Sequence, residues 1–143
     1  MTSQYQTIQH RWFEEVWNKG RADAIDEMLD PDVIAHGLID PEGNEVRGTE
    51  QFKQFYASFR GAFPDIQVLV EDSVSEGDKI VGRCRVKGTH RGEGLGIAPT
   101  NRPVEFTGMC MMRVREGKIL EAWNSFDFMT MYQQIGVLSL TGK

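Results

Sequence analysis

The chain has 143 residues, and 40% of them are hydrophobic. This length allows one domain with one core, so we expect a single domain over residues 1–143. A net charge of -5 and a pI near 5.2 argue against a dedicated binder of nucleic acid or of anionic membranes, because such proteins concentrate Lys and Arg against phosphates.

The N-terminus and the scattered cysteines and histidines do not indicate a membrane protein or a metal protein. The N-terminus lacks a basic start followed by an apolar run, and no segment reaches transmembrane length, so we expect a cytoplasmic protein. Cys84 and Cys110 fall in expected strands without metal-ligand spacing, and the three histidines are equally scattered. We therefore expect buried thiols, no metal, and a small molecule as the partner.

Helical spacing of apolar residues characterises the first half of the chain. An amphipathic helix ends at Asn18-Lys19-Gly20, and its apolar positions include Ile8, Trp12, Val16 and Trp17. A shorter helix is expected from Asp23 to Leu29, before Asp30-Pro31, and residues 33–36 indicate a short extended piece.

A third helix is expected to begin at Thr49 and to end before Pro64. It carries a single aromatic stripe, formed by Phe52, Phe55, Tyr56, Phe59 and Phe63. Such a stripe is more often core than a ligand cage.

After Pro64 the helical period disappears and long strands follow. Residues 66–70, 80–89, 104–115 and 118–128 are expected to be strands, with short turns at Glu76-Gly77-Asp78 and Glu116-Gly117. The chain thus has its helices first and an antiparallel meander after them. This order indicates an α+β fold, in which N-terminal helices pack in the concave face of a curved, mostly antiparallel sheet.

The last expected strand carries an acid among apolar neighbours. Strict alternation places Asp127 on one face with Ile119 and Trp123, and Asn124 on the opposite face unless a bulge intervenes. A carboxylate on an apolar face must find a partner, stay protonated or do chemistry. The alternative is that Asp127 caps the turn into residues 128–130.

The opposite face of the sheet would carry Cys110, Met112 and Phe126. Because such a face needs cover, we expect a homodimer, or a dimer of dimers, through the sheet.

Residues 89–102 form a long glycine-rich connection between two expected strands. A phosphate loop would lead from a strand into a helix N-terminus and end in Gly-Lys-Ser/Thr, which this segment does not. We expect a pocket rim here, with a plain hairpin loop as the alternative. His90 either orients a substrate carbonyl or bonds to the loop backbone.

One set of residues extends from the glycine-rich loop to the end of the chain: His90, Gly92, Gly96, Pro99, Thr100 and Arg102, then Glu116-Gly117-Lys118-Ile119, Trp123, Asp127 and Gln134-Ile135-Gly136. In this order and spacing the sequence resembles the SnoaL-like polyketide cyclase family. The resemblance implies a cone-shaped α+β barrel of the ketosteroid isomerase and nuclear transport factor type with a deep pocket. It also implies a cofactor-independent intramolecular aldol condensation of a small carbonyl compound, with Asp127 as acid/base catalyst.

That chemistry needs a carboxylate whose pKa an apolar pocket raises, so that it can take a proton from a carbon acid and return one to the new alkoxide. His90 is the second candidate catalytic residue. Candidate substrate-binding residues are Arg113, His36 in the short extended piece, and walls formed by Met109, Met111, Trp123, Phe52 and Tyr56. Each wall residue has a plain core role as its alternative.

The strand face of Met109, Met111 and Arg113 departs from the pattern of the family's antibiotic-pathway cyclases, which place polar residues, including a histidine, along it. Arg113 is the residue that matters here. By parity it points with Met109 and Met111 and could face Asp127. An Asp127–Arg113 pair would lower the pKa of the acid and suit water addition, as in the epoxide hydrolases of this fold. A rim arginine, and a non-catalytic ligand-binding domain, are the remaining alternatives.

Overall fold

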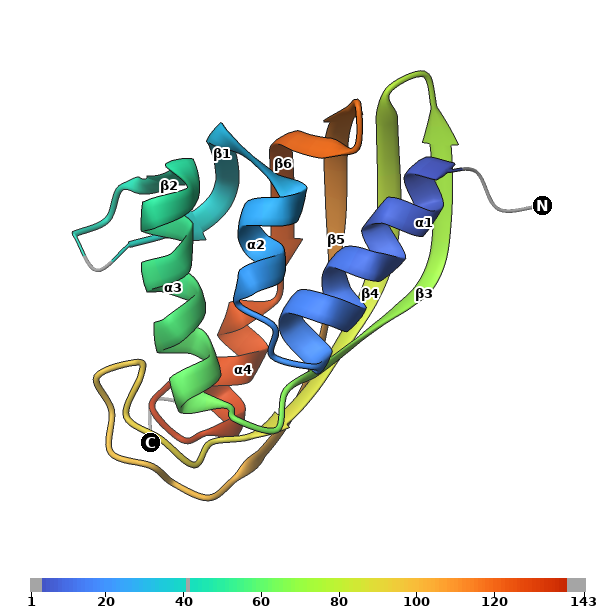
Figure 1. Ribbon diagram of the computed structural model, residues 1–143. Coiled ribbons are helices and arrows are strands. Elements are labelled where there is room, and N and C mark those ends of the chain that lie inside the picture. Colours follow the sequence, from blue (N-terminus) through green and yellow to red (C-terminus); the bar gives the residue numbers. More distant parts are fainter. Residues whose placement is uncertain (1–3, 41, 139–143) are drawn as a thin grey trace.

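The computed structural model describes residues 4–40 and 42–138 (Figure 1). The helices are α1 Gln4–Arg11, its π-helical continuation η1 Trp12–Asn18, α2 Asp23–Met28, α3 Gly48–Ala62 and α4 Phe128–Gln134. The strands are β1 Leu29–Ile39, β2 Glu45–Arg47, β3 Gln67–Glu76, β4 Lys79–Thr89, β5 Pro103–Arg115 and β6 Lys118–Phe126.

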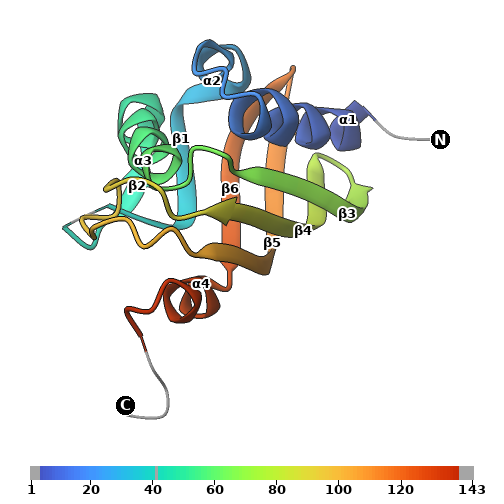
Figure 2. The same cartoon turned by 90° about the horizontal axis from the view of Figure 1, so that it is seen from below.

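One six-stranded sheet organises the chain, in the order β2-β1-β6-β5-β4-β3. All neighbours are antiparallel except β1 and β6, which run parallel. The helices α1, η1, α2 and α3 cover the concave face of the curved sheet, while α4 packs on β5 at one end (Figure 2). The expected α+β fold is therefore confirmed.

Local signals explain most of the boundaries. The second helix lies where it was expected, and α3 ends before Pro64, but Arg47 in extended conformation precedes α3, so Thr49 is not its cap. The extended piece expected at 33–36 is part of an 11-residue strand, β1. Within the described residues, no helix is long and apolar enough to cross a bilayer.

The core lies between the helices and the concave sheet face. The π-helical turn η1 buries two adjacent aromatics, Trp12 and Phe13, together with Val16 and Trp17. The aromatic stripe of α3 is core as expected, except that Phe55 stays partly exposed. Tyr56 donates its hydroxyl proton to the Val16 carbonyl at 2.8 Å, which ties α3 to η1.

A bulge in β6 decides which residues face the core. Arg113 pairs with Glu121, but the next β5 residue, Val114, pairs with Ile119, so Leu120 is an extra residue on β6. Such a bulge breaks the period-2 alternation. As a result Ile119 faces the interior together with residues 122, 124 and 126 rather than with 121, 123 and 125.

Candidate functional site

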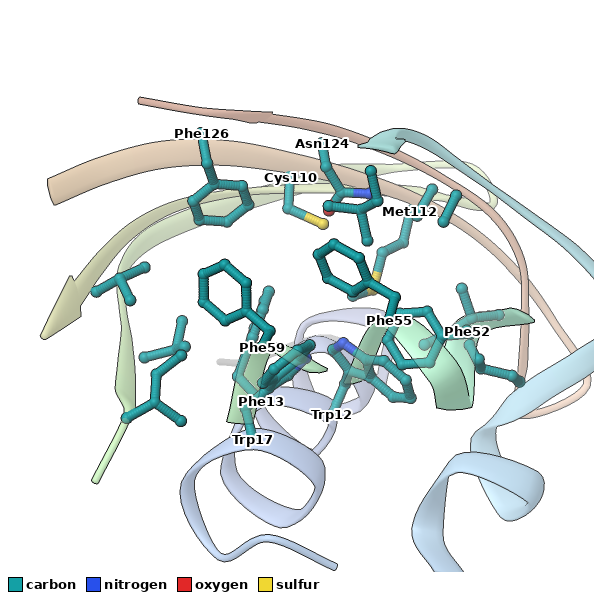
Figure 3. Close-up of a pocket in the computed structure, with 18 of the residues that line it drawn as sticks. Trp12, Phe13, Trp17, Phe52, Phe55, Phe59, Cys110, Met112, Asn124 and Phe126 are labelled. Atoms are coloured by element: carbon teal, nitrogen blue, oxygen red, sulfur yellow. The ribbon is translucent and has the colours of Figure 1, made fainter. Parts of the chain in front are cut away.

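An apolar cavity lies between the helices and the concave face of the sheet (Figure 3). Its volume is about 70 Å³. Aromatic side chains from η1 and α3 close one side, and β1, β5 and β6 close the other. Lining residues include Trp12, Phe13, Trp17, Phe52, Phe55, Phe59, Cys110, Met112, Asn124, Phe126 and Phe128.

Asn124 brings an amide into this apolar space. It reaches from β6 toward the side chains of Cys110 and Met112 (Figure 3). Its Nδ2 donates to the His36 carbonyl oxygen at 3.1 Å, which leaves one N–H and the Oδ1 atom for another partner. Among the described lining residues there is no Asp, Glu, His, Lys or Arg. Burial raises the pKa of the Cys110 thiol, so this group stays protonated near neutral pH.

A larger groove lies outside the cavity, with a volume of about 1040 Å³. It runs between β1, α3, α4 and the glycine-rich loop, and three carboxylates, Asp40, Glu42 and Glu93, line it. No Lys or Arg is among its described lining residues. The groove therefore presents a negative potential to any ligand that enters.

The glycine-rich loop packs directly on α3. A Cβ at Gly92 would collide with the Gly61 carbonyl oxygen, and one at Gly94 with the Ser58 carbonyl oxygen. Only glycine permits this approach of two backbones. Because Gly94 and Leu95 also line the groove, the loop forms part of its rim, as expected from the sequence.

Asp127 does not lie in the cavity. It precedes α4, where its Oδ1 accepts from the Thr130 N–H at 3.0 Å and its Oδ2 from the Thr130 hydroxyl at 2.6 Å. These bonds lower the pKa of the exposed carboxyl, so the expected raised pKa is wrong. The reason is the β6 bulge, which separates Ile119 from the face that was expected to surround the acid. The capping alternative describes its position.

His90 is fully buried beneath the loop and is not among the residues that line the cavity or the groove. Its Nδ1 accepts from the Thr100 N–H at 3.2 Å and lies 3.0 Å from the Thr100 hydroxyl oxygen. Because Nδ1 accepts the Thr100 N–H, this nitrogen carries no proton of its own. This geometry matches the alternative in which His90 holds the loop.

His36, Trp123 and Arg113 do come together, but on the convex face of the sheet. The His36 ring stacks on Trp123 with centroids 5.4 Å apart, and its nitrogens lie 2.6 Å from carboxylate oxygens of Glu45 and Glu121. Hydrogen bonds to these carboxylates raise the pKa of His36, those to Glu121 most. This cluster lies outside the cavity.

The expected pairing of Asp127 with Arg113 is wrong. Arg113 Nη2 lies 3.3 Å from Glu121 Oε1, and the two residues are partners in the β5–β6 register. Asp127 follows the far end of β6 and bonds to Thr130 instead.

Met109 and Met111, which were expected to line the pocket, lie on the opposite face of the sheet. Met109 is 47% exposed, and in register Met109 and Met111 lie beside Ser125 and Trp123 on the convex face. Cys110 and Met112 line the cavity instead, so they give no apolar outer face for a dimer to cover. The homodimer stays a prediction, without that premise.

Of the other expected walls, Phe52 lines the cavity and Tyr56 is buried beside it without lining it. Asn124 was missed, because strict alternation placed it on the face away from the pocket. Alternation along β5 indicated only the inner face of that strand, whose even-numbered positions are apolar or small: Val104, Phe106, Gly108, Cys110, Met112 and Val114. Within the described residues no group of three or more His, Cys, Asp or Glu could hold a metal.

Comparison with known proteins agrees with this architecture. The family model for SnoaL-like polyketide cyclases matches residues 7–135. Aklanonic acid methyl ester cyclase AcmA of Streptomyces galilaeus is 28% identical over 123 residues, which cover 85% of this chain and 84% of that protein. Nogalonic acid methyl ester cyclase of Streptomyces nogalater is 28% identical over 121 residues, covering 84% of this chain and 89% of that protein.

Among solved structures, wild-type IdmH from Streptomyces antibioticus superimposes with a TM-score of 0.80 at 34% identity, covering 94% of this chain and all of that one. The match to the family model extends over most of the chain and agrees with the resemblance seen in its motifs. The chain belongs to the SnoaL-like polyketide cyclase family.

Proposed function

We propose that the protein is a cyclase that closes a ring in a small, uncharged polycarbonyl compound by intramolecular aldol condensation. The observation that carries this proposal is the apolar cavity with one amide, Asn124, inside a fold whose relatives include methyl ester cyclases. A methyl ester suits the acidic groove better than a free carboxylate would, because like charges repel.

In this reaction a carbon between two carbonyl groups loses a proton, the enolate carbon forms a bond to a ketone carbon, and the resulting alkoxide takes up a proton. An apolar cavity holds the two carbons close together and excludes water. The spare N–H of Asn124 donates to the oxygen on which negative charge develops. The cavity thus supplies orientation and one directed dipole.

Asp127 is the proposed proton acceptor, as the family resemblance implies. It lies between Phe126 and Phe128, two residues that line the cavity. Its carboxylate must release Thr130 to reach a substrate, and its lowered pKa makes it a weak base. Because the hydrogen bonds from Thr130 are what lower this pKa, their release makes the Asp127 carboxylate a stronger base as it turns toward the substrate.

The substitution Asp127→Asn tests this role cleanly. Asparagine caps helices about as well as aspartate, so α4 keeps its cap while the base is lost. We expect Asp127→Asn to fold like wild type and to lose turnover of polycarbonyl methyl esters, measured as cyclised product by liquid chromatography. Equal turnover by Asp127→Asn and wild type would remove Asp127 from the mechanism.

A non-catalytic ligand-binding domain is the second candidate. It is favoured by the absence of any acidic or basic side chain among the described residues that line the cavity. Saturable binding of a polycarbonyl ester without conversion, in wild type and in Asp127→Asn alike, would support it against the cyclase.

A further inference from the structure

The inner cavity and the outer groove share three lining residues, the phenylalanines Phe55, Phe59 and Phe128. Phe55 and Phe59 lie one turn apart on α3 with stacked rings, their centroids 5.7 Å apart at 21°. Phe128, at the start of α4, meets Phe59 edge-on at 6.0 Å. These three rings separate the two spaces.

The cavity is too small for a multi-ring ligand while the rings stay in place. Pockets for drug-sized molecules measure roughly 300–1,000 Å³, whereas the cavity has about 70 Å³ and the groove about 1040 Å³. A ligand that reaches Asn124 must therefore pass from the groove between the phenylalanines and displace at least one of them.

Phe55 is the ring best placed to move. Phe59 is only 7% exposed, and its ring contacts those of Trp17, Phe55, Phe63 and Phe128. The Phe55 ring contacts one ring fewer, those of Trp17, Phe52 and Phe59, so its rotation would disturb fewer neighbours. Phe55 is partly exposed at the groove, and Figure 3 shows its ring projecting into the space beside Asn124. A rotation of Phe55 toward the groove would open the cavity and uncover the face of Phe59.

We propose that Phe55 is a specificity-determining gate, and that a planar multi-ring carbonyl compound takes its place in the stack against Phe59. This inference rests on the proposed function for the carbonyl groups of its ligand, while the flat ring system is argued from the stacked rings of Phe55 and Phe59. The ring system replaces one stacking partner by another, so the aromatic contact is kept while the carbonyl reaches Asn124. A compound with one ring offers less aromatic face to Phe59, so it gains less from displacing Phe55.

Tryptophan fluorescence reports on this gate without any need for turnover. The chain has three tryptophans, of which Trp12 and Trp17 line the cavity and Trp123 lies on the convex face. The parent protein for this experiment is Trp123→Phe. We expect acrylamide to quench the tryptophan fluorescence of Phe55→Ala in this background several-fold more strongly than that of the parent. Phe52→Ala is the matched control, because it removes the same ring from the same helix without facing the groove.

The ligand class is tested with two neutral aryl ketones, fluorenone with three fused rings and acetophenone with one. We expect Phe55→Ala to bind fluorenone about ten-fold more tightly than the parent, since no ring must be displaced, and acetophenone nearly unchanged. The fluorenone affinity of Phe55→Leu should lie between those of the parent and Phe55→Ala. If thermal melting shows that Phe55→Ala does not fold, Phe55→Leu is used in its place.

Unchanged quenching in Phe55→Ala, or equal increases in Phe55→Ala and Phe52→Ala, would overturn the gate. Equal gains for both ketones, or no fluorenone binding by any protein, would overturn the ligand class. Since neither readout depends on catalysis, a protein that binds fluorenone as predicted but cyclises nothing refutes the cyclase and leaves the gate standing.

Discussion

Replacement of Asn124 by leucine separates the stability of the cavity from its chemistry. Leucine has nearly the shape of asparagine but can neither donate to the His36 carbonyl nor contact a substrate oxygen through hydrogen bonds. We expect the Asn124 amide to contribute more to substrate binding and turnover than to the stability of the folded protein.

The stability effect should be small because two contributions oppose each other. An acceptor left without its donor costs about 1–3 kcal/mol, and a buried leucine side chain contributes about 1.5–3 kcal/mol. Since both groups are only partly buried, we expect the free energy of unfolding of Asn124→Leu to lie within about 1 kcal/mol of wild type. Urea denaturation followed by circular dichroism measures this difference.

The catalytic effect should be much larger. Removal of one donor to a developing oxyanion lowers kcat by about 10²–10³, or about 2.7–4 kcal/mol. We expect a loss of this size in Asn124→Leu on a polycarbonyl ester that wild type converts. Ser125→Ala, which alters the next residue on the convex side, is the control and should keep wild-type rates. A variant that is both stable and fully active would refute the role of Asn124.

Three further predictions concern stability and ligand charge. The pKa of His36 is raised above its ordinary value of 6.5, so the stabilisation that protonated His36 contributes is complete below pH 6.5. This stabilisation is lost as pH rises through the pKa of the folded protein. The urea midpoint should therefore fall over this range in wild type and stay flat in His36→Gln. Gly94→Ala should lower the melting temperature far more than Gly61→Ala, whose Cβ on helix α3 would meet only the Gly94 Cα at an ordinary 3.8 Å, and equal losses would contradict the loop–helix packing. A methyl ester should bind at least about ten-fold more tightly than its free acid at low ionic strength, a preference that salt should reduce and that replacement of Glu93 by Gln should weaken.

The architecture could be predicted because hydrophobic period changes once along the chain. Helical spacing up to Pro64 and alternation beyond it specify helices over an antiparallel meander. The parallel contact between β1 and β6 joins residues nearly ninety positions apart, such as His36 and Trp123, and no local pattern encodes it.

The site was harder to predict because one extra residue in a strand moves every later side chain of that strand to the opposite face of the sheet. The extra residue Leu120 moves Ile119 to the side of Asn124, so an alternation counted from Ile119 assigns Asn124 and Asp127 to the wrong surroundings. The β5 pattern pointed the right way, with Cys110 and Met112 inside. Continued without the bulge, the pairing of Val114 with Ile119 would bring Trp123 opposite Cys110, so the β5 pattern alone could not place Asn124 in the cavity.

The most direct test of the substrate site is the nuclear magnetic resonance signal of the Asn124 side-chain amide in ¹⁵N-labelled protein, assigned by its loss in Asn124→Leu. On titration with a polycarbonyl methyl ester, this signal should shift in a saturable way together with the indole N–H signals of Trp12 and Trp17, while that of Trp123 stays in place. Saturable binding that shifts Trp123 and leaves Asn124, Trp12 and Trp17 unchanged would contradict a substrate site in the cavity.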